Sequence, residues 1–116
     1  MKISTSVDER GTALVVVEGE VDAHTAGDLD KALSDLLAQG RSRLVLDFTR
    51  LDYISSAGLR TLLRAQQAAR KFGGEVRLFG LNDHVLKVFE MAGFHRMLRI
   101  AATREEALEG LVRGEA

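Results

Sequence analysis

The segment LDYISSAGLRTLL, residues 51–63, decides the fold and poses the question of function. Leu59, Leu62 and Leu63 follow at helical spacing, and two serines, Ser55 and Ser56, stand just before them. A helix leaves its first backbone N–H groups without partners inside the helix, and a serine at the N-cap position satisfies one of them. The pair therefore marks a helix start, and one serine is enough to cap it.

The hydrophobic staple distinguishes the two serines. It is a contact between an apolar residue just before the cap and another at the fourth helical position. With Ser55 as the cap, these positions are Ile54 and Leu59, which are both apolar, whereas with Ser56 as the cap they are Ser55 and Arg60. We therefore predict that Ser55 caps the helix and that Ser56 lies in its first turn, with a hydroxyl that no structural role requires.

The residues after the serines are small. Ala57 and Gly58 leave the first-turn amides open to an approaching group, and the positive end of the helix dipole favours an anion there. The place also follows a strand, and open α/β sheets bind ligands at the carboxyl ends of their strands. The site therefore suits a phosphoryl group. Without further evidence, however, the simpler interpretation is that both serines are solvated residues at a helix start.

Outside this segment, the hydrophobic pattern predicts alternating strands and helices. Strands are expected at 3–7, 13–17, 44–48, 76–79 and 97–100, the first with one buried face and the second covered on both. Helices are expected to begin after Thr25, Ser55, Asn82 and Thr103. Thr25 with Asp28 and Thr103 with Glu106 have the spacing of capping boxes. The first three helices are expected to end near Gly40, Gly73 and Gly93. The apolar face of the second helix is expected to include Ala69 and Phe72.

The predicted order is β-β-α-β-α-β-α-β-α. This order indicates one α/β domain with a mixed, mostly parallel sheet, in which the first two strands form an antiparallel hairpin around Gly11. A chain of 116 residues fits a single domain.

Composition narrows the class of partner. Formal net charge is -1 without a basic block, which gives no reason to expect nucleic acid or an anionic membrane. Cysteine is absent, the longest apolar run (residues 13–17) is too short to span a bilayer, and the first residues lack the apolar core of a signal peptide, so we expect a cytoplasmic protein. His24, His84 and His95 lack metal-ligand spacing, and phosphate-binding glycine motifs are absent, so we expect neither metal nor cofactor.

Three segments resemble a known family. They are GEVDAHTAGDL (residues 19–29), LVLDFTRLDYISSAGLRTLL (44–63) and GGEVRLFGLNDHVLKVFEMAGF (73–94), in the order found in STAS domains. The resemblance covers nearly the whole chain and is strongest to bacterial anti-sigma factor antagonists. It implies one STAS domain over residues 1–116, with an N-terminal hairpin and about four helices.

The resemblance implies a switch protein and not an enzyme. In that family, the antagonist binds an anti-sigma factor that is also a serine kinase, and the sigma factor is released. The kinase phosphorylates one serine of the antagonist, which then dissociates, and a PP2C-type phosphatase restores it. The acceptor lies two residues before the motif glycine, which corresponds here to Ser56 before Gly58. Many members carry aspartate where this chain has Ser55, so Ser55 brings a second hydroxyl and is the alternative acceptor.

The resemblance also implies a partner surface. It places the loop with Asp22, His24 and Thr25 near the acceptor, where the loop would contact the kinase or its nucleotide. An equally good interpretation is that Thr25 only caps the helix and Asp22 only shapes the turn. Arg60 and Arg64 lie four apart and are expected either on the partner surface or on a solvated face. The full expected set is Asp22, His24, Thr25, Ser55, Ser56, Ala57, Gly58, Arg60 and Arg64.

The sequence is also compatible with two other functions. One is a STAS module of another signalling or transport complex, and the other is a nucleotide-binding domain, which the missing phosphate-loop motif disfavours. Asp47 and Asp52 follow the pattern of turn or capping acids better than that of a metal or phosphoryl site. The oligomeric state does not follow from the sequence.

Overall fold

The chain begins with the predicted hairpin. In the computed structural model, which describes residues 1–111, β1 (Lys2–Val7) pairs antiparallel with β2 (Ala13–Val21). Gly11 closes the turn with a φ of 86°, a conformation that glycine adopts without steric cost.

The rest of the described chain alternates strands and helices, with one strand more than the pattern predicted. The elements are α1 (Ala26–Ala38), β3 (Arg43–Asp47), β4 (Leu51–Ile54), α2 (Ser56–Lys71), β5 (Glu75–Phe79), α3 (Asp83–Met91), the short 3₁₀ helix η1 (Phe94–Arg96), β6 (Arg99–Ala101) and α4 (Arg104–Leu108).

The strands form one six-stranded sheet. Its order is β1-β2-β3-β5-β6, and β4 pairs with the far end of β2. Every pair other than β1 with β2 is parallel, as expected from strands that alternate with helices. The mixed, mostly parallel sheet with an N-terminal hairpin is thus confirmed.

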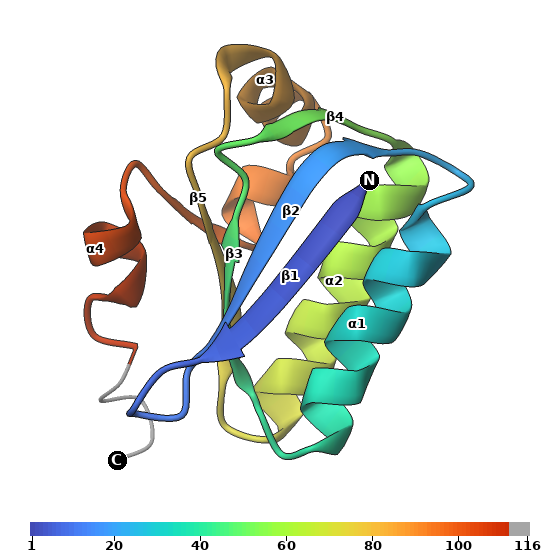
Figure 1. Ribbon diagram of the computed structural model, residues 1–116. Coiled ribbons are helices and arrows are strands. Elements are labelled where there is room, and N and C mark those ends of the chain that lie inside the picture. The colour runs from blue at the N-terminus through green and yellow to red at the C-terminus, as the bar shows by residue number, and fades with distance from the viewer. Residues whose placement is uncertain (112–116) are drawn as a thin grey trace.

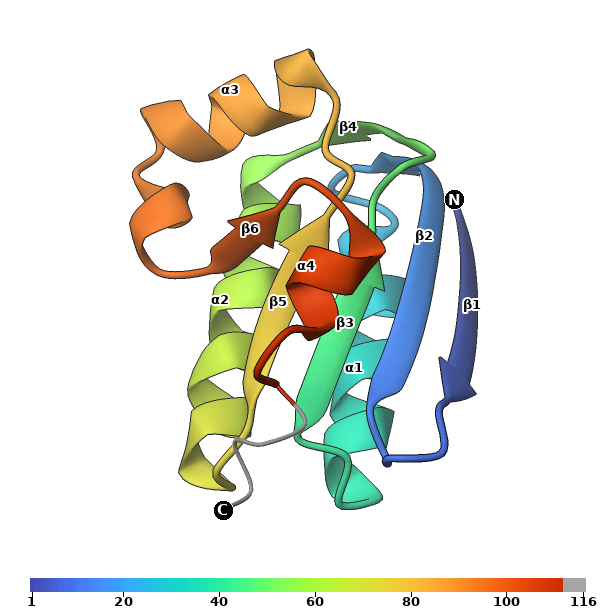
Figure 2. The same ribbon diagram turned by 90° about the vertical axis from the view of Figure 1, so that its left-hand side faces the viewer.

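Helices cover both faces of the sheet. Figure 1 shows α1 and α2 side by side on one face, and Figure 2 shows α4 on the other, while α3 lies at the end of the sheet beside β4. The main core lies under α1 and α2 and includes Leu29, Leu62 and Phe48, all fully buried. A smaller cluster under α4 contains Val45, Phe79, Ala107 and Leu111. Figure 1 also shows α2 running along the sheet with its first turn beside β4.

The sequence pattern missed β4 and the second half of β2. β2 runs past Val17 to Val21, because Gly19, with a φ of 91°, lets the strand bend and shift register before it pairs with β4. β4 has only its two end residues, Leu51 and Ile54, buried, so it lacks the alternation that reveals a strand.

Three expectations about burial are wrong. On β1, Ile3 is only half-buried and Val7 is 42% exposed, because β1 lies at the edge of the sheet. On β2, Val16 is half-buried, since it lies on the face away from α1 and α2 and is not part of the cluster under α4. Phe72 is 71% exposed, because it lies at the C-cap, where α2 has already ended.

The helix ends follow local chemistry closely. Asn82 caps α3 by accepting the Val85 N–H at 2.8 Å, and Thr103 caps α4 by accepting the Glu106 N–H at 3.2 Å. Gly73 follows the last residues of α2 with positive φ, as predicted. The final strand is displaced by one or two residues from its predicted position, because η1 occupies the segment before it.

Candidate functional site

The first turn of α2 has the predicted arrangement. Ser55 is the N-cap in an extended conformation, and its Oγ accepts the N–H of Gly58 at 3.2 Å. The helix begins at Ser56, and Ile54 and Leu59 on either side of it are both buried. The assignment of Ser55 as cap is confirmed.

Ser56 is the first helical residue and is exposed to solvent. Within residues 1–111, its hydroxyl forms no hydrogen bond to any other group of the protein. Ala57 beside it is half-buried and small, so the approach to Ser56 is open. The Ser56 hydroxyl is therefore free to react or to be bound, whereas the Ser55 hydroxyl is already engaged.

A backbone contact joins the start of α2 to the end of β2. The Ser55 N–H donates to the Val21 carbonyl at 2.8 Å, and Val21 pairs with Ile54 across β2 and β4. Because parallel strands end at the same edge of a sheet, the loop that follows Val21 lies beside the serines. Figure 1 shows this β2–α1 loop next to the first turn of α2.

The β2–α1 loop is built around the carboxylate of Asp22. Its Oδ1 accepts the N–H of His24 at 2.9 Å, the N–H of Thr25 at 3.0 Å and the Thr25 hydroxyl at 3.1 Å. The Asp22 N–H in turn donates to the Thr25 Oγ1 at 2.9 Å. These bonds close a tight turn of the kind that aspartate forms with its own following residues.

The capping box predicted for Thr25 and Asp28 is wrong. Thr25 is the N-cap of α1, but its side chain accepts no N–H of the helix, because the Asp22 N–H already occupies its oxygen. The first turn uses backbone carbonyls instead, as the Ala26 N–H donates to the Asp22 carbonyl at 2.9 Å. The side chain of Thr25 thus stabilises the loop, while its backbone carbonyl accepts N–H groups of the helix.

The hydrogen bonds in this loop favour the charged form of Asp22. The N–H and the hydroxyl of Thr25 lower the pKa of Asp22 most, desolvation opposes them, and the N–H of His24 lowers the pKa further. The carboxylate therefore stays ionised at neutral pH and leaves a negative charge on the loop beside the serines.

The remaining predicted residues occupy different surroundings. Gly58 is buried, so it presents no surface to a partner. Arg60 is exposed on α2, while Arg64 lies 3.6 Å from a carboxylate oxygen of Asp30 on α1. Arg64 is therefore directed towards α1, one full turn of helix beyond Arg60.

Tyr53 is an exposed residue close in sequence to the serines that the sequence pattern did not single out. It lies on β4, is 41% exposed and stands two residues before Ser55. Exposed aromatic side chains are enriched at protein interfaces. Recognition of β4 as a strand would have placed it beside the serines.

Asp47 makes the contact expected of a turn acid. The Asp47 Oδ1 accepts the N–H and the hydroxyl of Thr49 at 2.9 and 2.6 Å, which is a turn contact. Across residues 1–111, no group of three or more His, Cys, Asp or Glu side chains has the geometry to hold a metal ion. None of the helices in this range has the length and apolar character needed to cross a membrane.

Comparison with known proteins agrees with this fold. The STAS domain family model matches residues 4–107. BtrV of Bordetella bronchiseptica, provisionally assigned as an anti-sigma factor antagonist, is 40% identical over 97 residues, which is 84% of each chain. The anti-sigma-B factor antagonist of Listeria monocytogenes is 33% identical over 102 residues, which is 86% of this chain and 90% of the relative.

Solved structures show the same fold at lower identity. A Thermotoga maritima protein, also provisionally assigned as an anti-sigma factor antagonist, has a TM-score of 0.88 at 20% identity over 94% of this chain and 93% of that one. The Bacillus cell fate determinant SpoIIAA, which is an anti-sigma factor antagonist, has in its phosphorylated form a TM-score of 0.72 at 24% identity over 93% of this chain and 97% of that one. Sequence relatives and fold agree, and the chain belongs to the STAS domain family, among its anti-sigma factor antagonists.

Proposed function

We propose that this protein is an anti-sigma factor antagonist that binds an anti-sigma factor with serine kinase activity, and that phosphorylation of Ser56 ends this binding. The observation that carries the proposal is the state of Ser56: an exposed hydroxyl at the first position of α2 with no hydrogen bond to residues 1–111. The relatives, which are anti-sigma factor antagonists by name, supply the class of partner.

The proposed partner surface has the first turn of α2 at its centre. Ser55, Ser56 and Ala57 supply the helix start, and Asp22, His24 and Thr25 supply the loop beside it. Tyr53 extends the surface over β4, and Arg60 extends it along α2. Gly58 contributes by close packing below the surface, and Arg64 contributes through its ion pair with Asp30 of α1. Tyr53 is the aromatic anchor we expect at such an interface.

Phosphorylation acts through charge at this surface. The kinase transfers the γ-phosphoryl group of ATP to the Ser56 Oγ, which loses its proton, and ADP leaves. The modification adds about 1.5 to 2 negative charges at neutral pH. A charge of that size is costly to bury in an interface and is repelled by acids that face it, so affinity falls by about two to three decades for a differential of a few kcal/mol.

The fold accepts the phosphoryl group without rearrangement. A group on Ser56 lies at the positive end of the α2 dipole, where negative charge is stabilising. Because the unmodified hydroxyl has no partner to lose, the antagonist keeps its structure, and a PP2C-type phosphatase can restore the first state. Such a cycle takes place where sigma factors act, which is the cytoplasm.

Ser55 is the less suitable acceptor. Its Oγ caps α2 through the Gly58 N–H and is half-buried, so a kinase must first break the cap to reach it. Loss of such a cap costs about 1 kcal/mol. The free hydroxyl next to it carries no such cost.

Phosphosite mapping with matched variants tests the proposal. The protein is incubated with its cognate kinase and ATP, and the labelled residue is identified by mass spectrometry. Ser56→Ala is expected to abolish labelling, whereas Ser55→Asn keeps a good cap without a hydroxyl and is expected to be labelled as wild type.

Binding of the kinase is measured on the same variants. Ser56→Ala should bind the anti-sigma factor whether or not ATP is present, and the phosphorylated wild type should not bind. Label on Ser55, no label at all, or a phosphorylated form that still binds tightly would contradict the proposal. Binding to a transporter subunit in place of a kinase would favour a STAS module of another complex.

A further inference from the structure

The sheet ends at β6, on the side opposite the hairpin. β6 is three residues long and pairs only with β5, through the pairs Arg77 with Arg99, Leu78 with Ile100 and Phe79 with Ala101. Its other edge has no neighbouring strand within the described chain. Outward-pointing N–H and carbonyl groups along such an edge are a template for another strand.

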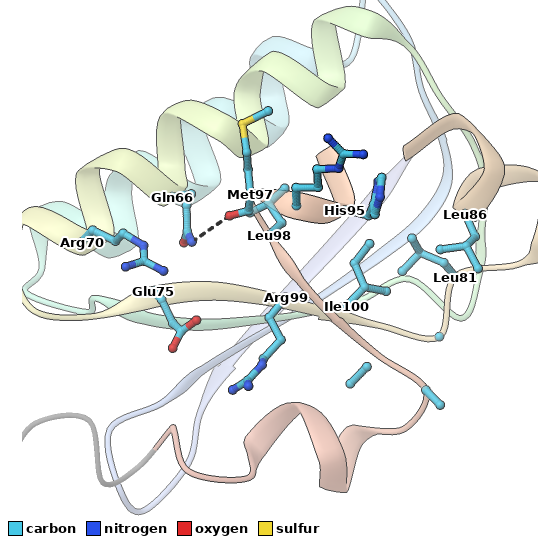
Figure 3. Close-up of a pocket in the computed structure, with 14 residues that line it drawn as sticks. Gln66, Arg70, Glu75, Leu81, Leu86, His95, Met97, Leu98, Arg99 and Ile100 are labelled. Carbon is cyan, nitrogen blue, oxygen red and sulfur yellow. Dashed lines mark hydrogen bonds between the residues drawn. The ribbon is translucent and has the colours of Figure 1, made fainter. Parts of the chain in front are cut away.

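The groove beside this edge has a volume of about 960 Å³. Residues 95–102, which include all of β6 and the segment that leads into it, form its length. Figure 3 shows Arg70 from α2 near one end, and Leu81 and Leu86 near the other. The groove therefore has β6 and the segment before it along one side, and α2, the start of β5 and the residues around α3 along the other.

A buried side chain beside the groove takes the place of strand pairing. Gln66 is 4% exposed; its Oε1 accepts the N–H of Val76 on β5 at 2.7 Å, and its Nε2 donates to the Met97 carbonyl at 3.2 Å. The N–H of Val76, on the part of β5 that β6 does not reach, is thus paired inside the protein. Among the described residues, the strand without a neighbour on this side of the sheet is β6.

The two faces of β6 offer different chemistry. Figure 3 shows Ile100 directed towards Leu81, while Arg99 leaves the strand on the opposite side, towards α4. A strand added to this edge would place its own side chains alternately on these two faces. One set would meet apolar side chains, and the other set would meet Arg99.

Charge around the groove is predominantly positive. Three arginines, Arg70, Arg96 and Arg99, line it, and all three are exposed. The single acid of the lining, Glu75, lies 3.0 Å from the buried guanidinium of Arg77 and is neutralised by it. A negatively charged occupant is therefore favoured.

We propose that the β6 edge binds an extended segment of a partner protein, in which acidic and apolar residues alternate, as a seventh strand of the sheet. Main-chain hydrogen bonds to β6 hold the segment, and the alternating side chains select it. The proposal does not depend on Ser56: Arg70 lies about 20 Å along α2 from Ser56, at 1.5 Å per residue. A partner on this edge and one at the serine can bind together.

The opposite edge of the sheet provides an internal comparison. The groove between β1 and α1 is lined by Asp28 and by Lys31 paired with Asp35 at 3.1 Å, so its charge is negative. An acidic strand is disfavoured there. Comparison of the β1 and β6 edges therefore tests whether an acidic strand needs positive charge beside an exposed edge, or whether an exposed edge alone is enough.

Peptide binding to the full chain tests the proposal. The probe is a labelled peptide of about seven alternating aspartate and valine residues, and the control peptide has the same composition in two blocks. Fluorescence anisotropy at about 0.15 M ionic strength should show the alternating peptide bound at least about tenfold more tightly. Arg99→Glu should weaken that binding at least about tenfold, whereas Arg10→Glu, the same charge change at the β1–β2 turn, should leave it within about twofold.

Hydrogen exchange identifies the edge that is used. Amides of residues 99–101 should be protected by the alternating peptide, and those of β1 should not. Equal binding of both peptides, equal loss in the two variants, or no protection at 99–101 would overturn the proposal. So would a dimer in sedimentation that Arg99→Glu dissociates, because the occupant would then be a second copy of this chain.

Discussion

Gly58 lies so close to Val21 that no side chain fits between them. A β-carbon on Gly58 would stand 2.8 Å from Val21 Cγ1 and 2.7 Å from Ile54 Cγ1, both below the 3.0 Å at which atoms must move. Both neighbours are β-branched and rotate little. The first turn of α2 therefore rests directly on the ends of β2 and β4, which fixes where Ser56 emerges.

We predict that Gly58→Ala destabilises the protein by about 1–3 kcal/mol, the usual cost of overpacking a core. Gly27→Ala is the matched control, because Gly27 lies in the first turn of α1 with nothing within 4 Å of its β-carbon position. That change should stabilise by about 0.5–1 kcal/mol. Urea unfolding of both variants measures the difference, and equal stabilities would contradict the packing argument.

The two serines should differ in their contribution to stability. Ser55→Ala removes the acceptor of the Gly58 N–H and should cost about 1 kcal/mol, whereas Ser55→Asn should cost little. Ser56→Ala should change the free energy of unfolding by less than about 0.5 kcal/mol, since its hydroxyl has no partner in residues 1–111. Thermal or urea unfolding measures these values, and a large loss for Ser56→Ala would reveal a structural role for that hydroxyl.

Gln66 and Gln67 provide a test of the bridge between β5 and the Met97 carbonyl. Gln66→Ala leaves the Val76 N–H without its partner, and a buried polar group left unpaired costs about 1–3 kcal/mol. Gln67→Ala, on the exposed face of the same helix, should stay within about 0.5 kcal/mol of wild type. Urea unfolding distinguishes the two, and a neutral Gln66→Ala would mean that water replaces the amide.

The features that the sequence predicted depend on neighbouring residues. Ser55 as the cap, Asn82 as the cap of α3 and Gly73 at the end of α2 each follow from contacts within one turn of helix. The different roles of Ser55 and Ser56 could be predicted from the sequence for the same reason. A hydrophobic staple and an N-cap both join residues that are close in the sequence, so the sequence alone can predict them.

The features that the sequence missed depend on distant contacts. β4 is a strand because the bend at Gly19 brings β2 alongside it, and nothing in residues 51–54 alone indicates this partner. Thr25 failed as a side-chain cap because Asp22 competes for its oxygen, and Arg64 meets Asp30 only once α1 packs on α2. Such pairings appear only when the elements are assembled.

The loop beside the serines should give a stability contribution that depends on pH. Because hydrogen bonds from Thr25 and His24 lower the pKa of Asp22 in the folded protein, its carboxylate form stabilises the fold. That contribution is fully present above the ordinary pKa of aspartate and is lost as the pH falls through the lower, folded value. The difference in free energy of unfolding between wild type and Asp22→Asn should therefore be constant between about pH 7 and 5 and should shrink below about pH 4. Urea unfolding at a series of pH values measures this difference, and an NMR titration of the Asp22 carboxyl at its ordinary pKa would contradict it.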